Sequence, residues 1–112
     1  MTQSDLSGTY RDDQLDATLT ISGADVSKGS IAGGSIVYGG HTYEWLTGKF
    51  GFENNTGSST VVAVVAINNI VGSIAFTLGT TQPLYTTLVG VGSEAKFNGV
   101  TFQHNANFRK TS

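Results

Sequence analysis

The segment Thr60-Val61-Val62-Ala63-Val64-Val65-Ala66-Ile67 carries the clearest structural signal in this sequence of 112 residues. Its β-branched residues favour a β-strand, in which successive side chains point to opposite faces. Both faces of this strand are apolar, so we expect both to be buried. One row, formed by Val62, Val64 and Ala66, is predicted to face a core. The other row is predicted to lie against a second copy of the chain in a homo-oligomer, or alternatively beneath a loop of the same chain; its members are Val61, Ala63, Val65 and Ile67.

Seven further strand-forming segments flank this one and are separated by turn signals. They cover residues 6–10, 17–21, 30–38, 41–52, 70–78, 84–91 and 96–103. The dipeptide Gly39-Gly40 predicts a two-residue hairpin. About eight strands with short connections are typical of an all-β, antiparallel, up-and-down β-barrel, whereas a two-sheet sandwich needs some longer connections. We therefore predict a single barrel domain over residues 1–112, with a polar tail at 104–112 that frays.

Composition limits the classes of function. Only 12% of the residues are charged, and the formal net charge is −2. The six Lys and Arg residues are scattered, so we expect no nucleic-acid partner. The chain has no cysteine, which excludes disulfides and thiolate metal sites. No apolar run approaches the roughly 18 residues of a membrane span, so we expect no membrane partner.

The first residues, Met1 to Asp5, lack the charged and apolar regions of a signal peptide. The cytoplasm is therefore the default expectation for localisation, and a secreted mature form stays open.

The titratable residues form no recognised catalytic or metal-binding motif. His41 and His104 fall at strand ends, where we expect them to be solvated. Asp12, Asp13 and Asp16 cluster in the first turn, where Asp side chains accept hydrogen bonds from nearby backbone groups. We accordingly assign no catalytic residue, no metal and no cofactor, and leave open whether the protein is an enzyme.

Several segments resemble the avidin and streptavidin family, within the calycin group of small barrels. Ser7-Gly8-Thr9-Tyr10 is similar to the family's opening Thr-Gly-Thr-Trp, and Leu46-Thr47-Gly48-Lys49-Phe50 is similar to its Leu-Thr-Gly-Arg-Tyr. The segment from Gly92 to Asn98 resembles a hairpin that leads into the family's penultimate strand. Thr87-Leu88-Val89-Gly90 instead resembles the closing strand, and these two alignments exclude one another.

The resemblance implies an eight-stranded barrel that holds a ligand at one end. Asp12 aligns with the family's polar residue after the first strand. The family holds biotin in a box of several tryptophans, but this chain has a single tryptophan, Trp45, on a strand where the family's key tryptophans do not lie. A buried aromatic box supplies much of such affinity, so we expect no high-affinity biotin binding.

Three hypotheses for function follow. The first is a barrel that binds a small hydrophobic or amphipathic ligand. The second is a small barrel enzyme of the cyclase or isomerase type, with Asp12 or Glu44 as an acid. The third is a sugar-binding lectin or a structural homo-oligomer. Alternation along residues 41–52 places Tyr43 and Trp45 on one face, although which face is internal stays open. The predicted ligand-binding residues are Asp12, Tyr38, Tyr43, Trp45 and Phe76.

Overall fold

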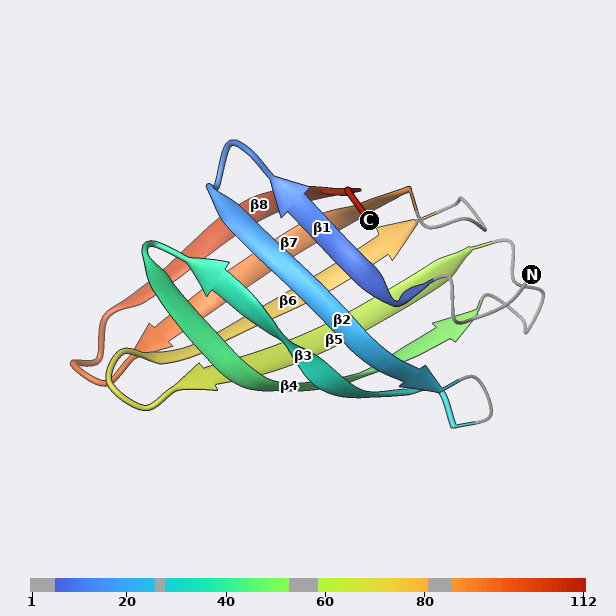
Figure 1. Ribbon diagram of the computed structural model, residues 1–112. Coiled ribbons are helices and arrows are strands. Elements are labelled where there is room, and N and C mark those ends of the chain that lie inside the picture. The colour runs from blue at the N-terminus through green and yellow to red at the C-terminus, as the bar shows by residue number, and fades with distance from the viewer. Residues whose placement is uncertain (1–5, 26–27, 53–58, 81–85) are drawn as a thin grey trace.

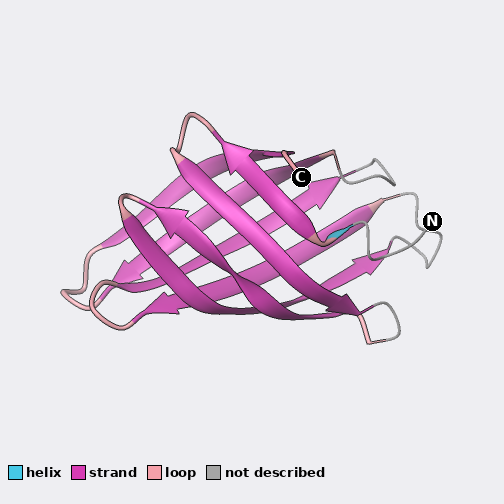
Figure 2. Ribbon diagram, in the orientation of Figure 1, coloured by secondary structure: helices cyan, strands magenta, loops and turns pink. Residues whose placement is uncertain are grey.

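The computed structural model describes residues 6–25, 28–52, 59–80 and 86–112, which form a closed antiparallel β-barrel (Figure 1). Helix is confined, within these residues, to Leu6, and Figure 2 shows strands joined by turns. The barrel is elongated, with extents of 42 × 26 × 24 Å. The strands are β1 (Gly8–Asp12), β2 (Ala17–Asp25), β3 (Ser30–Tyr38), β4 (His41–Phe52), β5 (Thr60–Asn68), β6 (Gly72–Thr80), β7 (Thr87–Lys96) and β8 (Thr101–Lys110).

Each strand pairs with the next along the chain, so the up-and-down order is confirmed. The first and last strands close the barrel, because Tyr10 and Arg11 pair with Lys110 and Arg109. Three backbone hydrogen bonds extend this seam: Thr9 N–H donates to the carbonyl of Ser112, and the N–H groups of Thr111 and Ser112 donate to that of Thr9. Over these residues the edges of β1 and β8 pair with each other rather than standing free.

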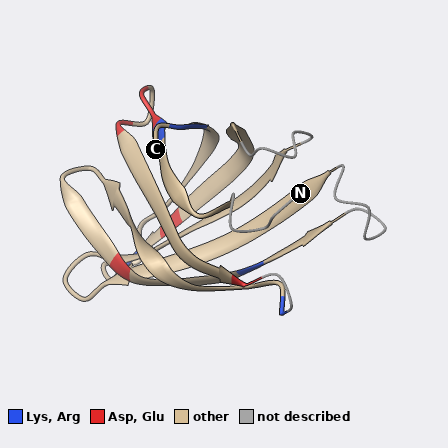
Figure 3. Ribbon diagram, turned by 45° about the vertical axis from the view of Figure 1, so that its right-hand side comes forward, with Lys and Arg blue, Asp and Glu red and all other residues tan. Residues whose placement is uncertain are grey.

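Strand β5 shows the alternation that its sequence predicts. Val62, Val64 and Ala66 are buried in the barrel, whereas the residues between them are exposed. The outward row is therefore apolar and open to solvent in the single chain. Figure 3 shows long stretches of strand without a charged residue, in keeping with the low charge of the sequence.

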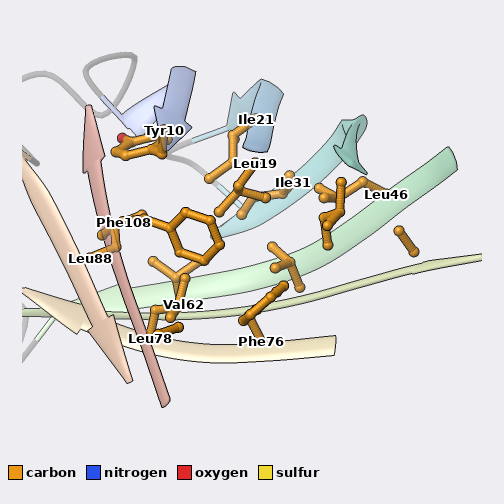
Figure 4. Close-up of a cluster of buried hydrophobic side chains, with 14 of the residues drawn as sticks. Tyr10, Leu19, Ile21, Ile31, Leu46, Val62, Phe76, Leu78, Leu88 and Phe108 are labelled. Carbon is orange, nitrogen blue, oxygen red and sulfur yellow. The ribbon is translucent and has the colours of Figure 1, made fainter. Parts of the chain in front are cut away.

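Apolar side chains from all eight strands fill the middle of the barrel and its end near the chain termini (Figure 4). The ring of Phe76 on β6 meets the ring of Phe108 on β8 edge to face, with centroids 5.0 Å apart. Tyr10 is fully buried, and its hydroxyl donates a hydrogen bond to the carbonyl of Leu6. Eight-stranded barrels enclose either a packed core or one small ligand. In this barrel, buried apolar side chains occupy most of the interior.

The C-terminal strands differ from the prediction. The expected turn at Gly92-Ser93-Glu94 is wrong, because β7 runs through these residues to Lys96. The turn instead includes Gly99, which has a φ of 87°. Residues 104–110 belong to β8 rather than to a fraying tail, because Ala106 and Phe108 are buried in the core. Polar residues alternate with these two on the outer face, which makes the segment look hydrophilic when it is read without its partner strands.

The connection between β5 and β6 also differs slightly from the prediction. Ile70 was expected on the strand with Ile74, but it lies in the turn and is exposed. The side-chain oxygen of Asn68 accepts hydrogen bonds from the N–H groups of Ile70 and Val71, which satisfies the backbone of this turn. The predicted start of the seventh strand, Leu84, lies outside the described residues. Among the described residues, no helix is long and apolar enough to span a bilayer.

Candidate functional site

A cavity of about 330 Å³ opens at the end of the barrel where β3 turns into β4 and β7 turns into β8. This end lies opposite the chain termini (Figure 1). The residues around the cavity combine aromatic rings with titratable groups. They are Tyr38, Gly39, His41, Tyr43, Val71, Glu94, Lys96, Phe102 and His104.

The β3–β4 hairpin builds one wall of the cavity. Gly39 and Gly40 both have left-handed φ angles, 61° and 78°, which a two-residue hairpin of this type requires and glycine adopts freely. The hairpin pairs Tyr38 with His41. Tyr43 follows two residues further on and is buried. The predicted tight turn is thus confirmed, and it brings these aromatic side chains together.

The β7–β8 pair builds the opposite wall. Glu94 pairs with Phe102, and Gly92 pairs with His104. Alternation along each strand directs Glu94 and His104 toward the same side of the sheet. Glu94 is only 4% exposed. A carboxylate buried to this extent costs free energy unless a ligand or a protein group compensates its charge.

A polar cluster joins the two walls. Nε2 of His104 lies 3.6 Å from Oε2 of Glu94 and 3.4 Å from the hydroxyl oxygen of Tyr38. The ring centroids of Tyr38 and His104 are 5.4 Å apart. The cluster can therefore offer a bound molecule a carboxylate acceptor, an imidazole and a phenol within one small volume.

The charge of Glu94 acts on both tyrosines. Burial raises the pKa of Tyr38 above its ordinary value, and the nearby carboxylate of Glu94 raises it further. The pKa of Tyr43 is raised by the same two causes, with burial again the larger, and to a smaller extent by Tyr38. Both phenols consequently stay protonated at neutral pH and remain available as hydrogen-bond donors.

Aromatic faces continue from the cluster to the rim of the cavity. The rings of His104 and Phe102 are stacked, with centroids 6.2 Å apart and planes 26° from parallel. Phe102 is 44% exposed, so part of its ring is open to solvent. Nζ of Lys96 lies 5.3 Å from the centroid of Phe102, which is within the range of a cation–π contact.

Phe76 lies one row deeper than the cavity. It pairs with Gly92, whereas Ile74 pairs with Glu94. A Cβ atom on Gly92 would come within 2.2 Å of the Phe76 ring, so the missing side chain leaves the room that this ring occupies. Phe76 is buried against Phe108 and does not line the cavity. The structure places this predicted site residue in the core.

Trp45 is on the opposite side of the barrel wall from Tyr43. The register between β4 and β5 shifts between Glu44 and Thr47, and Trp45 has a φ of 56°. This bulge lets both Tyr43 and Leu46 point inward, and it leaves Trp45 66% exposed on the outside. The expectation that Tyr43 and Trp45 share a face is therefore wrong, because a bulge adds one residue to a strand whose side chains otherwise alternate.

Asp12 lies apart from the cavity, in the turn after β1. Its Oδ1 accepts hydrogen bonds from the N–H groups of Gln14 and Leu15, at 3.0 and 3.1 Å. Its Oδ2 accepts one from the N–H of Asn107, at 2.7 Å. These contacts fix the turn and tie it to β8, so the carboxylate is engaged with backbone groups rather than aimed at the cavity.

The predicted site and the observed cavity share Tyr38 and Tyr43. Glu94 and Phe102 line the cavity but are not among the predicted site residues, and His104 lies inside it rather than at a solvated strand end. The alternation of Phe102, His104, Ala106 and Phe108 could have shown that these residues share the inner face. Within the described residues, no three His, Cys, Asp or Glu side chains come close enough to hold a metal ion. No protein-family model matches the chain, and no curated protein matches it either.

Proposed function

We propose that the protein is a binding barrel that holds a small amphipathic molecule in the cavity between the β3–β4 and β7–β8 turns. The observation that carries this proposal is the convergence of Tyr38, Glu94 and His104 at a cavity of about 330 Å³ at one end of the barrel. Aromatic rings combined with a few convergent polar groups are found in small-molecule sites. The apolar part of the ligand would pack on Tyr43 and Phe102.

An architecture like that of avidin supports the same function. Ser7-Gly8-Thr9-Tyr10 lies at the first strand and Leu46-Thr47-Gly48-Lys49-Phe50 on the fourth, where the resemblance requires them. The segment Gly92–Asn98 ends β7 and leads into the last strand, β8, rather than into the penultimate strand. Thr87–Gly90 lies on β7 rather than on the closing strand, so neither of the two alignments fits this strand order. Trp45 faces outward, so no tryptophan among the described residues contributes to the cavity. We therefore retain the prediction that biotin is not bound tightly.

Ligand titrations followed by NMR test the proposed site. We expect benzyl alcohol, and to a smaller extent the anionic benzoate, to move the amide resonances of Glu94 and His104 more than those of the outer face. Val71→Phe would fill the cavity and weaken this binding about tenfold or more, since the added ring takes the ligand's place. Val37→Phe adds the same ring to the outer face and serves as the control. Equal responses in the two variants, or no response at the cavity to either compound, would refute the proposal.

We further propose that the outward row of β5 packs against a second copy of the chain. Over β5, β6 and β7 the outward side chains include no charged residue. Exposed valines and one isoleucine continue across this face; they are Val61, Val65, Ile67, Val89 and Val91. A contiguous apolar surface of this kind is unusual on a monomer and typical of an interface. Two copies related by a two-fold axis would cover each other's apolar face.

Native mass spectrometry tests the interface and also reveals any small molecule that co-purifies. Val65→Lys would place a charge in the middle of the proposed contact, so we expect a dimer or larger assembly to dissociate. Thr20→Lys, on the outer face of β2, makes a comparable change away from the interface. A monomeric unaltered protein at micromolar concentration would overturn this part of the proposal.

A further inference from the structure

Glu94 is a buried carboxylate without a hydrogen-bond partner in the described part of the chain. Its one ionic neighbour there, Nε2 of His104, lies at 3.6 Å, which is longer than a hydrogen bond. No fully enclosed side-chain nitrogen or oxygen lacks a partner among the described residues. The oxygens of Glu94 are therefore not sealed in the core but reach the cavity, where a bound molecule can meet them.

The walls around this carboxylate are aromatic. Tyr38 and Tyr43 come from the β3–β4 hairpin, and Phe102 and His104 come from β8. The face of an aromatic ring carries partial negative charge and attracts cations. Lys96 demonstrates this preference at the rim, since its ammonium group lies 5.3 Å from the centroid of Phe102. The Glu94 carboxylate thus shares its cavity with these four aromatic side chains, whose ring faces can contact a cation.

The alternatives fit this environment less well. An anionic ligand would place a second negative charge beside a carboxylate that is 4% exposed, with little solvent to screen the repulsion. A neutral ligand could donate a hydrogen bond to Glu94 but would bring no positive charge beside it. Lys96 also lines the cavity and would repel a cation, but this residue is partly exposed, so water screens its charge.

We propose that the ligand of the cavity carries an ammonium group, which binds beside the carboxylate of Glu94 and between the rings of Tyr43 and Phe102. This inference rests on the proposed small-molecule site and specifies its ligand class. Substituted ammonium groups suit such a site because they are weakly hydrated and make contact with several ring faces at once. The apolar remainder of the ligand would point toward the opening, past Val71.

Choline and its neutral isostere, the alcohol in which a tert-butyl group replaces the trimethylammonium group, test the proposal. The two probes have the same shape and differ only in charge. We expect choline to bind about tenfold more tightly than the alcohol, as measured by shifts of the Glu94 and His104 amide resonances. Glu94→Gln should reduce choline affinity about tenfold and leave the affinity of the alcohol within about twofold.

Two controls keep the experiment decisive. Glu44→Gln removes the same charge from the exposed outer face of β4 and should leave choline binding unchanged. Lys96→Met removes the repulsive charge at the rim and should tighten choline binding about twofold. If Glu94→Gln fails to fold, the comparison of the two probes on the unaltered protein still decides the question.

The outcomes separate the two proposals. Equal binding of choline and the alcohol, or benzyl alcohol moving the cavity resonances while choline does not, would overturn the ammonium inference and leave the small-molecule site standing. Failure of every probe to move the cavity resonances would overturn both.

Discussion

The two ends of the barrel interior are built from the same strands but are filled differently. Toward the chain termini, β6 and β8 contribute Leu78 and Phe108, and the space between the strands is packed with apolar side chains. Toward the β7–β8 turn, the inner faces of β7 and β8 carry Glu94 and His104, which line a cavity. Phe76 lies between the two regions and contacts Phe108.

This difference separates stability from function along the axis of the barrel. Close packing at the filled end supplies the burial that holds the strands together. The open end buries less apolar surface, because a cavity takes the place of packed side chains. It also holds the carboxylate of Glu94 away from bulk water, and burial of this charge is unfavourable unless a ligand binds there. Sites that reduce stability in this way are characteristic of binding and catalytic regions. The predictions that follow test whether the two ends really differ in this respect.

The largest expected effect is at the filled end. Phe108→Ala should reduce the free energy of unfolding by about 3–5 kcal/mol, because it leaves a cavity beside Phe76. Phe102→Ala, which removes the same ring on the same strand at the open end, should cost less than about 1 kcal/mol, because Phe102 is already 44% exposed. Urea denaturation of the two variants measures both values. Similar losses in the two would show that the ends are not energetically distinct.

The boundary between the two ends should be sensitive to added volume. Gly92→Ala introduces a Cβ atom that would lie 2.2 Å from the Phe76 ring, so we expect a loss of about 1–3 kcal/mol from overpacking. In the background of Phe76→Leu, which removes the ring, the same substitution should cost much less. A double-mutant cycle measured by chemical denaturation reports this coupling. Additive effects would mean that Gly92 is not required by Phe76.

Removing the charge at the open end should leave stability unchanged or increase it. Glu94→Gln keeps the shape of the side chain and removes a buried charge that has no hydrogen-bond partner in the described part of the chain. We expect the free energy of unfolding at neutral pH to rise by up to about 1 kcal/mol. Thermal and urea unfolding give the value. A loss of more than about 1 kcal/mol would identify Glu94 as a structural residue and weaken its assignment to the binding site.

The smallest expected effect concerns the titration of the tyrosines. Burial and the charge of Glu94 raise the pKa of Tyr38 and Tyr43 above the ordinary value of 10.0. Their contribution to stability should be complete below that pH and be lost as the pH rises toward the raised values, because the unfolded chain releases these protons first. Glu94→Gln should lower both pKa values, as followed by ultraviolet absorbance or NMR. Unchanged titration would show that the carboxylate does not act on these rings.

Much of the fold follows from local sequence. The alternation of Val62, Val64 and Ala66 predicts the inner row of β5, and Gly39-Gly40 predicts the hairpin that carries Tyr38. These features depend on neighbouring residues and on backbone conformations that glycine adopts easily. From these local features we predicted eight strands in an up-and-down order, as observed. The same features led us to include Tyr38 and Tyr43 among the predicted site residues, and both line the cavity.

The sequence by itself thus determined the number of strands, their up-and-down order and the apolar outer face of β5, because side-chain alternation and turn chemistry are local properties. The bounds of β7 and β8 differed from the prediction. Only the tertiary structure decided which residues meet at the open end. The pairing of β7 with β8 places Glu94 beside His104, and the bulge in β4 turns Trp45 outward. Register and bulges depend on the fit of distant strands against a shared core, and a shift of one residue moves every following side chain to the other face.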